Sequence, residues 1–339
     1  MKENSIFKDM ENDVNSSNLD EHTKKKFFEN ILNLKNKKVN LMITGATGCG
    51  KSSTINAMFN MDVAKVGIGV DPETMEIKKH ELDNLILWDS PGLGDGKEKD
   101  IEHSKGIISK LNELDENNNP LIDLVLIILD GGSRDLGTSY ELINSVIIPN
   151  LGKNAKDRVL IAINQADVAM KGRHWDFEKN KPEPKLVAFL EEKVKSVKNR
   201  VQEATGVNIE PIYYSAGFKD DDEAQRPYNL SKLLYFIVKN TPAEKRLAYV
   251  NTTSDDKEMW EDSDEIKDYT AEIQKSFVAT IVETSKAGGE IGKELGEVFG
   301  MGKTGEAIGK VAGAAIGVVS SVASSIGSAA STVAGWFGF

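Results

Sequence analysis

The sequence predicts an α/β fold in which a mostly parallel sheet is covered by helices. Two patterns carry this prediction: short, nearly continuous apolar segments, and longer helical patterns that alternate with them over residues 38–241. Apolar segments of this kind are typical of strands buried on both faces, and the intervening helices make neighbouring strands parallel. We expect strands at residues 39–44, 85–89, 121–130, 158–164 and 209–216, each followed by a helix.

The chain divides into four parts. Residues 1–37 begin with a polar stretch, expected to be a loose arm, and continue with a docking helix that carries Phe27 and Ile31 at helical spacing. Residues 38–243 form the α/β domain. An acidic segment at 244–286 is expected to form long polar helices, and residues 287–339 form a glycine-rich, apolar, helical tail.

Composition limits the classes of partner. The chain has 339 residues, and 53 acidic against 42 basic side chains give a net charge of −11, which offers no electrostatic footprint for DNA or another nucleic acid. A single cysteine, Cys49, excludes an internal disulfide or a cysteine-rich zinc site. The first residues lack the apolar core of a secretory signal, so we expect a cytoplasmic protein.

A phosphate-binding loop (P-loop) is predicted where the first expected strand meets its helix. The pattern G-x-x-x-x-G-K-S occurs here between strand and helix, and this context disfavours a chance glycine-rich turn. The glycines let backbone amides surround an anion at the helix N-terminus, Lys51 reaches the β- and γ-phosphates, and the Ser52 hydroxyl ligates Mg²⁺. The expected nucleotide-binding residues of the loop are Gly45, Ala46, Thr47, Gly48, Cys49, Gly50, Lys51, Ser52 and Ser53.

Two further elements are expected near the γ-phosphate. Asp89 ends the second expected strand in the sequence DSPG, where its carboxylate can hold Mg²⁺ through water and the Gly92 amide can approach the phosphate. The alternative is an ordinary Asp-Pro-Gly turn. Thr74, in the stretch 61–77, is the candidate that closes over the γ-phosphate and Mg²⁺, with a plain surface threonine as the alternative.

The base is expected to be guanine. In the sequence NQAD the Asp167 carboxylate can accept from the two N–H groups on guanine's edge, and Asn164 can bridge the purine to the P-loop. Ser215 and Ala216, after the next strand, add backbone donors for the guanine carbonyl. These contacts favour GTP over ATP.

In this order, the motifs GATGCGKSS, Thr74, DSPG, NQAD and SAG resemble those of the translation-factor-like GTPases. With TINAMF and the spacing of Asp130, Arg134 and Asp135, the chain is most similar to the Era-type branch that includes YfjP-like bacterial proteins. The resemblance implies a P-loop GTPase domain that uses Mg²⁺ to convert GTP to GDP and phosphate. The P-loop is also similar to that of septins and immunity-related GTPases, which associate with membranes and pair across their nucleotide faces.

Three positions depart from the pattern of these families. Leu93 stands where Ras-like GTPases carry a water-orienting glutamine, so slow hydrolysis is expected. Gly48 replaces the asparagine that coordinates potassium in several Era relatives. Gln165 replaces a lysine, and its shorter stem can still cover the base.

Two side chains have alternative interpretations. Arg134 can supply a positive charge to the transition state across a dimer, or form an ion pair with Asp130 or Asp135. Cys49 lies at a helix N-terminus, which lowers thiol pKa and suits a redox switch, or is simply a small loop residue.

The tail combines regular glycines with an uncharged stretch. Residues 311–339 contain no charged side chain and are long enough to span a bilayer, although their serines weaken insertion. The apolar residues of the same stretch also recur at the spacing of a soluble helical bundle. The glycines, which permit close helix packing, are Gly288, Gly292, Gly296, Gly300, Gly305, Gly309, Gly313 and Gly317.

These observations give a first hypothesis of a GTP-hydrolysing switch that controls membrane association or assembly of the tail. We expect such a protein to be peripheral or conditionally inserted at a membrane and to form a homodimer or homo-oligomer through the nucleotide face or the tail. The alternative is an Era-like assembly factor for a ribosome or another complex, with the tail as a protein-packing element. A scaffold with a silent P-loop is the third hypothesis.

Overall fold

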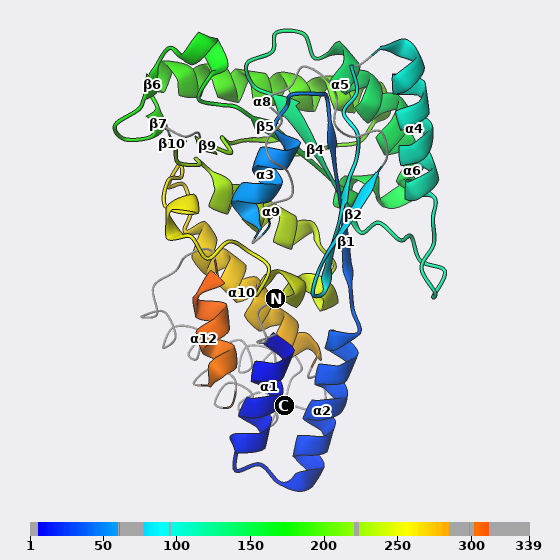
Figure 1. The fold of residues 1–339 in the computed structure, drawn as a ribbon, viewed down its shortest axis with the longest axis vertical. Helices are drawn as coiled ribbons and strands as arrows, with labels where there is room; N and C mark the ends of the chain where they lie inside the picture. Colours follow the sequence, from blue (N-terminus) through cyan, green and yellow to red (C-terminus); the bar gives the residue numbers. More distant parts are fainter. Residues whose placement is uncertain are drawn as a thin grey trace.

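A computed structural model describes residues 6–59, 61, 77–94, 96–219, 224–284, 298 and 302–311. Within these residues the central sheet has six strands in the order β2-β3-β1-β4-β5-β8 (Figure 1). Only β2 runs antiparallel to its neighbour, so the predicted mostly parallel sheet is confirmed. The strands are β1 (Val39–Gly45), β2 (Lys78–Leu82), β3 (Leu85–Asp89), β4 (Leu124–Asp130), β5 (Val159–Asn164) and β8 (Ile212–Tyr213).

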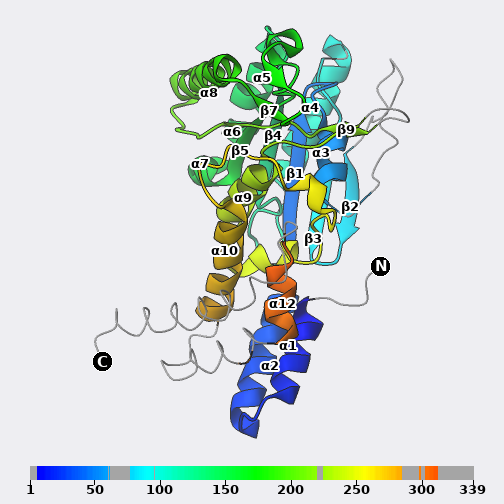
Figure 2. The ribbon, with the colours of Figure 1, turned by 90° about the vertical axis from the view of Figure 1, so that its left-hand side faces the viewer.

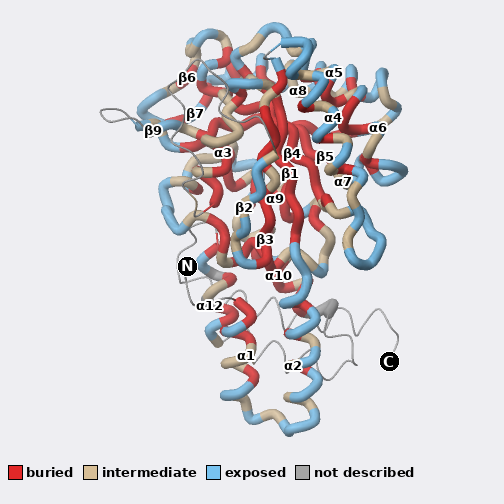
Figure 3. Tube along the Cα trace, turned by 45° about the vertical axis from the view of Figure 1, so that its right-hand side comes forward, coloured by how far each residue is buried: buried red, intermediate tan, exposed pale blue. Residues whose placement is uncertain are grey.

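Helices cover both faces of this sheet because alternate strand residues point to opposite sides. Leu41 and Ile43 of β1 belong to one hydrophobic core, and Met42 belongs to the other. Figure 3 shows the buried strands at the centre of the domain. The first core includes residues of α3 (Lys51–Met58), α9 (Leu230–Asn240) and α10 (Tyr269–Thr284), and the second includes residues of α4 (Lys97–Leu111), η1 (Leu142–Ile147), α6 (Ile148–Asn150) and α8 (Pro184–Thr205).

Short elements complete the domain and lie mainly in its connections. They include two small antiparallel hairpins, β6 with β7 and β9 with β10. Their bounds are α5 (Gly137–Glu141), η2 (Gly152–Asn154), α7 (Ala155–Arg158), η3 (Ala169–Gly172), β6 (Trp175–Asp176), β7 (Lys181–Pro182), β9 (Phe218–Lys219), β10 (Ala224–Gln225), η4 (Ala243–Tyr249) and η5 (Lys257–Met259).

The first part of the described chain is a helical hairpin, so the expectation of a loose arm is wrong for its residues 6–16. Helix α1 (Ile6–Ser16) buries Phe7, Met10 and Val14 on one face and packs against α2 (Glu21–Lys35). Asp20 caps α2 by accepting from the amides of His22 and Thr23. Lys8, Asn15 and Ser16 of α1 are exposed whereas Asp9 is buried, and the many polar residues between the apolar ones conceal the apolar stripe.

Helix α12 (Lys303–Gly309) packs on α1 and brings the two ends of the described chain together (Figures 1 and 2). The Asp13 carboxylate of α1 accepts hydrogen bonds from the amides of Lys303, at 2.9 Å, and Thr304, at 2.8 Å. Because β1 starts directly after α2, this helical cluster lies at the end of the sheet opposite the P-loop.

The acidic segment is helical only in part. Residues 250–268 are mostly turns and loop, with η5 as a short 3₁₀ turn, before α10 begins at Tyr269. The expectation of long polar helices is wrong here because aspartates bind nearby backbone amides instead: Asp256 accepts from Glu258, and Asp264 accepts from Ile266.

Most of the glycine-rich tail lies outside the described residues. Gly305 and Gly309 lie in α12, and the other glycines of the predicted row, together with residues 312–339, are not described. Among the described helices, none is both long enough and apolar enough to cross a membrane.

Candidate nucleotide-binding site

The P-loop joins the buried end of β1 to the N-terminus of α3. Gly50 precedes α3 with φ +89° and caps it without a side-chain hydrogen bond. A Cβ at Gly50 would overlap the side-chain amide of Asn164, so both the backbone angle and the space require glycine. The turn leaves the helix N-terminus facing the loop, which is the arrangement that attracts phosphate.

Lys51 runs back along the P-loop. Its Nζ donates to the carbonyl oxygens of Gly45, at 3.3 Å, and Ala46, at 3.1 Å. The ammonium group therefore lies at the loop, where it can neutralise phosphate oxygens. Ser52 and Ser53 follow in the first turn of α3.

Asp89 ends β3 beside the P-loop strand and is 5% exposed. Burial raises the pKa of its carboxyl, and the nearby Lys51 acts in the opposite direction. Its Oδ1 is buried and has no hydrogen-bond partner among the described residues. A buried carboxylate oxygen and the Ser52 hydroxyl are hard oxygen donors that fit Mg²⁺. Thr74, the third expected ligand, lies outside the described residues.

The segment after Asp89 lies directly against the P-loop. Leu93 pairs with Ala46 as an isolated parallel bridge, accepting from the Thr47 amide at 2.9 Å and donating to the Gly45 carbonyl at 3.4 Å. A Cβ at Gly92 would overlap Thr47, so this close approach needs glycine. The Leu93 side chain is 4% exposed and belongs to the second hydrophobic core.

Asn164 joins the P-loop to the segment of Ser215 and Ala216, which is expected to contact the base. Its Nδ2 donates to the Cys49 carbonyl at 3.0 Å, and its Oδ1 accepts from the Ala216 amide at 2.9 Å. The next residue, Gln165, has φ +60°, and its side chain donates to the Gly48 carbonyl at 3.0 Å. Segments separated by over a hundred residues therefore meet at one side chain.

Asp167 is held by the same cluster. The Ser215 hydroxyl donates to its Oδ1 at 2.6 Å, and the carboxylate is 7% exposed. The Gly217 amide approaches the Ser215 hydroxyl at 3.3 Å. The structure thus brings the expected P-loop and base-reading residues together at one end of the sheet, the carboxyl ends of the parallel strands.

Arg134 is exposed, and none of the ion pairs among the described residues includes it. The expected acidic partners are otherwise engaged: Asp130 accepts from the Gly132 amide, and Asp135 accepts from the Gly137 amide. Lys193 of α8, which no sequence pattern indicated, donates from its Nζ to the carbonyls of Gly131, at 2.6 Å, and Ser133, at 2.7 Å. It anchors the loop that carries Arg134, and no local motif indicates this role.

Cys49 does not have the environment of a reactive thiol. The side chain is 1% exposed, and burial raises the pKa of the thiol despite the favourable charge of Lys51. The hypothesis of a lowered thiol pKa is wrong because desolvation outweighs the helix N-terminus.

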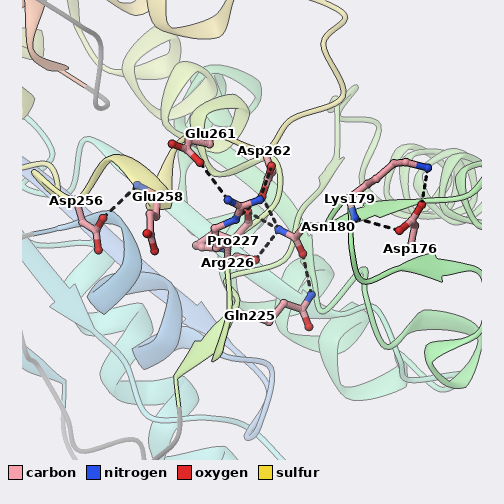
Figure 4. Close-up of polar contacts among 10 residues, drawn as sticks. All are labelled: Asp176, Lys179, Asn180, Gln225, Arg226, Pro227, Asp256, Glu258, Glu261 and Asp262. Carbon is pink, nitrogen blue, oxygen red and sulfur yellow. Dashed lines mark hydrogen bonds and ion pairs between the residues drawn. The ribbon is translucent and has the colours of Figure 1, made fainter. Parts of the chain in front are cut away.

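Residues 251–264, here called the strap, connect residues 226–229 to the end of α3. At one end Thr253 pairs with Phe59, and the Ser254 amide donates to the Met58 carbonyl at 2.8 Å. At the other end Arg226 forms ion pairs with Glu261, at 3.2 Å, and Asp262, at 3.1 Å (Figure 4).

The Asn180 side chain strengthens the second attachment of the strap. It donates to Asp262 at 2.7 Å and to the Arg226 carbonyl at 2.9 Å (Figure 4). Asn229, fully buried and with φ +59°, accepts from the Asp264 amide at 2.8 Å. The strap is therefore tied to residues 226–229, which come after the expected base-reading residues Ser215 and Ala216 in the sequence.

The fold and this site define a P-loop GTPase domain. Residues 40–165 match a family model described as 50S ribosome-binding GTPase. Two Escherichia coli (strain K12) proteins of uncharacterised function are similar in sequence. YkfA is 28% identical over 156 residues, covering 45% of this chain and 50% of YkfA, and YfjP is 30% identical over 131 residues, covering 38% and 41%.

The chain thus spans half or less of the length of these two relatives. Among solved structures, Era from Aquifex aeolicus is similar with a TM-score of 0.38 and 19% identity, covering 61% of this chain and 57% of that one.

Proposed function

We propose that this protein is a Mg²⁺-dependent GTPase that alternates between GDP- and GTP-bound states and hydrolyses GTP slowly. The observation that supports it most is the position of Asn164, which joins the P-loop at Cys49 to the base-reading segment at Ala216. Lys51 would neutralise phosphate charge, Asp167 would select guanine, and Thr74 would complete the site. Mg²⁺, held by Ser52, Thr74 and Asp89, would neutralise charge that develops between the β- and γ-phosphates.

Slow hydrolysis follows from the side chain at the usual water-orienting position. Leu93 is buried and has no polar atom with which to orient the attacking water. We propose that two copies pair across their nucleotide faces and that Arg134 of each contributes charge to its partner's site. Its exposure and the Lys193 anchor support this role. A GTPase rate that rises with protein concentration in the wild type, but not in Arg134→Ala, is expected; equal rates would contradict it.

We further propose that nucleotide state controls membrane association or assembly of the glycine-rich tail. The support is a continuous route from the site to α12. The strap starts beside Phe59, where the stretch that contains Thr74 begins, and leads into α10. Helix α10 packs on α9, and both α10 and α1 contact α12. A change at the γ-phosphate can therefore reach the base of the tail through packed elements.

Vesicle flotation tests the tail proposal. The full-length protein is mixed with anionic vesicles without nucleotide, with GDP, or with a non-hydrolysable GTP analogue. We expect flotation in the GTP-like state alone and its loss in the double variant Ile316→Glu, Ile326→Glu, since charges in the uncharged stretch oppose contact with lipid. Ile326→Leu is the matched control. A wild type that never floats would contradict the proposal.

A second function, assembly factor for a ribosome or another complex, is favoured by the description of the matching family model. The net charge of −11 weighs against direct contact with RNA. Co-sedimentation of the GTP-like state with ribosomal subunits, in the absence of vesicle flotation, would favour this function over the first.

A further inference from the structure

His103 of α4 contacts the segment that follows Asp89. The imidazole Nδ1 lies 3.1 Å from the Gly92 carbonyl oxygen, and the residue is 3% exposed. Because a carbonyl only accepts, Nδ1 carries the proton in this contact. The other ring nitrogen, Nε2, is buried without a hydrogen-bond partner among the described residues. An apolar side chain would fill this space at lower cost if the ring served packing alone.

The histidine holds one peptide unit from one end while the P-loop holds it from the other. The unit between Gly92 and Leu93 offers its carbonyl to His103, and its N–H donates to the Gly45 carbonyl at 3.4 Å. Asp100, one turn earlier on the same face of α4, accepts from the Gly94 amide at 2.8 Å. Helix α4 therefore fixes the segment at two points.

The contacts of α4 with this segment affect the neighbouring backbone amide, that of Gly92. The Gly92 N–H makes no hydrogen bond in the described part of the chain, and Gly92 abuts Thr47 of the P-loop. Fixing the following peptide unit also limits the direction of this N–H. We propose that His103 is a positioning residue that aims the Gly92 amide at the terminal phosphate, so that the protein distinguishes a nucleoside triphosphate from a diphosphate. This inference rests on the proposed binding of GTP.

The test compares three variants of the full-length protein with wild type. Dissociation constants for GDP and for a non-hydrolysable GTP analogue are measured calorimetrically with Mg²⁺. His103→Leu removes the donor, and we expect the analogue to bind about fivefold more weakly or worse, as the loss of one hydrogen bond implies, with GDP changed less than about twofold.

Asparagine and glutamine give a matched geometric pair. The side-chain nitrogen of Asn can take the place of the histidine Nδ1, whereas that of Gln takes the place of Nε2 and cannot reach the Gly92 carbonyl in the same way. We therefore expect His103→Asn to restore the preference for the analogue and His103→Gln to lose it. This pair also decides the question if the leucine variant does not fold.

Two outcomes contradict different parts of the argument. Equal weakening of GDP and the analogue in His103→Gln, or no weakening of either, would overturn the positioning role. Failure of the folded wild type to bind either nucleotide would instead contradict the proposed function.

Discussion

Asn164 and Cys49 are joined by a hydrogen bond of 3.0 Å from the side-chain amide to the P-loop carbonyl. This contact connects the end of β5 to the turn that precedes α3. Nucleotide affinity should therefore depend on Asn164 even where the side chain does not touch phosphate.

Asn164→Ala should weaken both GDP and a GTP analogue by about tenfold or more, because it leaves the Cys49 carbonyl and the Ala216 amide unpaired, at about 1–3 kcal/mol for each buried group. Titration with a fluorescent guanine nucleotide measures this. Asn112→Ala, at an exposed position, is the control and should retain wild-type affinity. Unchanged binding in the Asn164 variant would show that the bridge does not support the site.

Asp167→Asn should change base preference. In the proposed site the Asp167 carboxylate would accept from guanine's N–H groups, and an amide in its place would present a donor, which suits the carbonyl that xanthine has at this edge. We expect GDP to weaken by about 1–3 kcal/mol, or roughly tenfold to a hundredfold, with xanthosine diphosphate gaining. Competition binding measures both. Ser215→Ala removes only the 2.6 Å support of the carboxylate and should weaken GDP without favouring xanthine.

Cys49 should resist alkylation in the folded protein. Burial raises the pKa of the thiol, so the reactive thiolate is scarcer at a given pH than in the unfolded chain. Iodoacetamide at mildly alkaline pH should react more than about tenfold faster in urea than in buffer. Stability depends on pH for the same reason. Because burial disfavours the thiolate in the folded protein, the free energy of unfolding is higher while the thiol is protonated and falls as pH rises through the range in which the thiol titrates. Rapid labelling of folded protein would contradict the burial.

The ion pairs of the strap region should differ strongly in their effect on stability. Lys232 and Asp264 lie 2.6 Å apart with side chains 12% and 7% exposed, whereas Arg226 and Glu261 are 42% and 53% exposed. Lys232→Met leaves Asp264 buried without its cation and should cost about 3–5 kcal/mol. Arg226→Ala removes the exposed pair with Glu261 and the pair with Asp262, but Asp262 keeps its hydrogen bond from Asn180, so the change should cost less, roughly 1 kcal/mol. Urea unfolding of both variants gives the comparison, and equal costs would contradict the burial difference.

The sequence predicted the interior of the sheet better than its edge. Strands such as β4 consist almost wholly of buried apolar residues, so their pattern is strong. Strand β2, with the sequence KKHEL, lies at the edge with exposed or half-buried side chains and shows no such pattern. Helix α1 was not predicted for a related reason: its four buried apolar residues alternate in the sequence with Asp, Asn and Glu.

The candidate site shows a similar division. The P-loop, Asp89 and Asp167 belong to short motifs whose chemistry depends on neighbouring residues, so they could be named from the sequence. Lys193 and His103 could not, because each acts on a carbonyl brought near by folding, with Lys193 about sixty residues from its partners.

The contact between Asp13 and Lys303 closes a stretch of 290 residues, and this affects how the protein is made. At about 5–20 residues per second, a ribosome needs roughly 15–60 s to synthesise that stretch. During this interval the apolar face of α1 has α2 beside it but not α12. The two ends of the described chain therefore pair last. In a nascent chain, α1 is synthesised first and waits longest for its partner, so we expect it to need chaperones for the longest time.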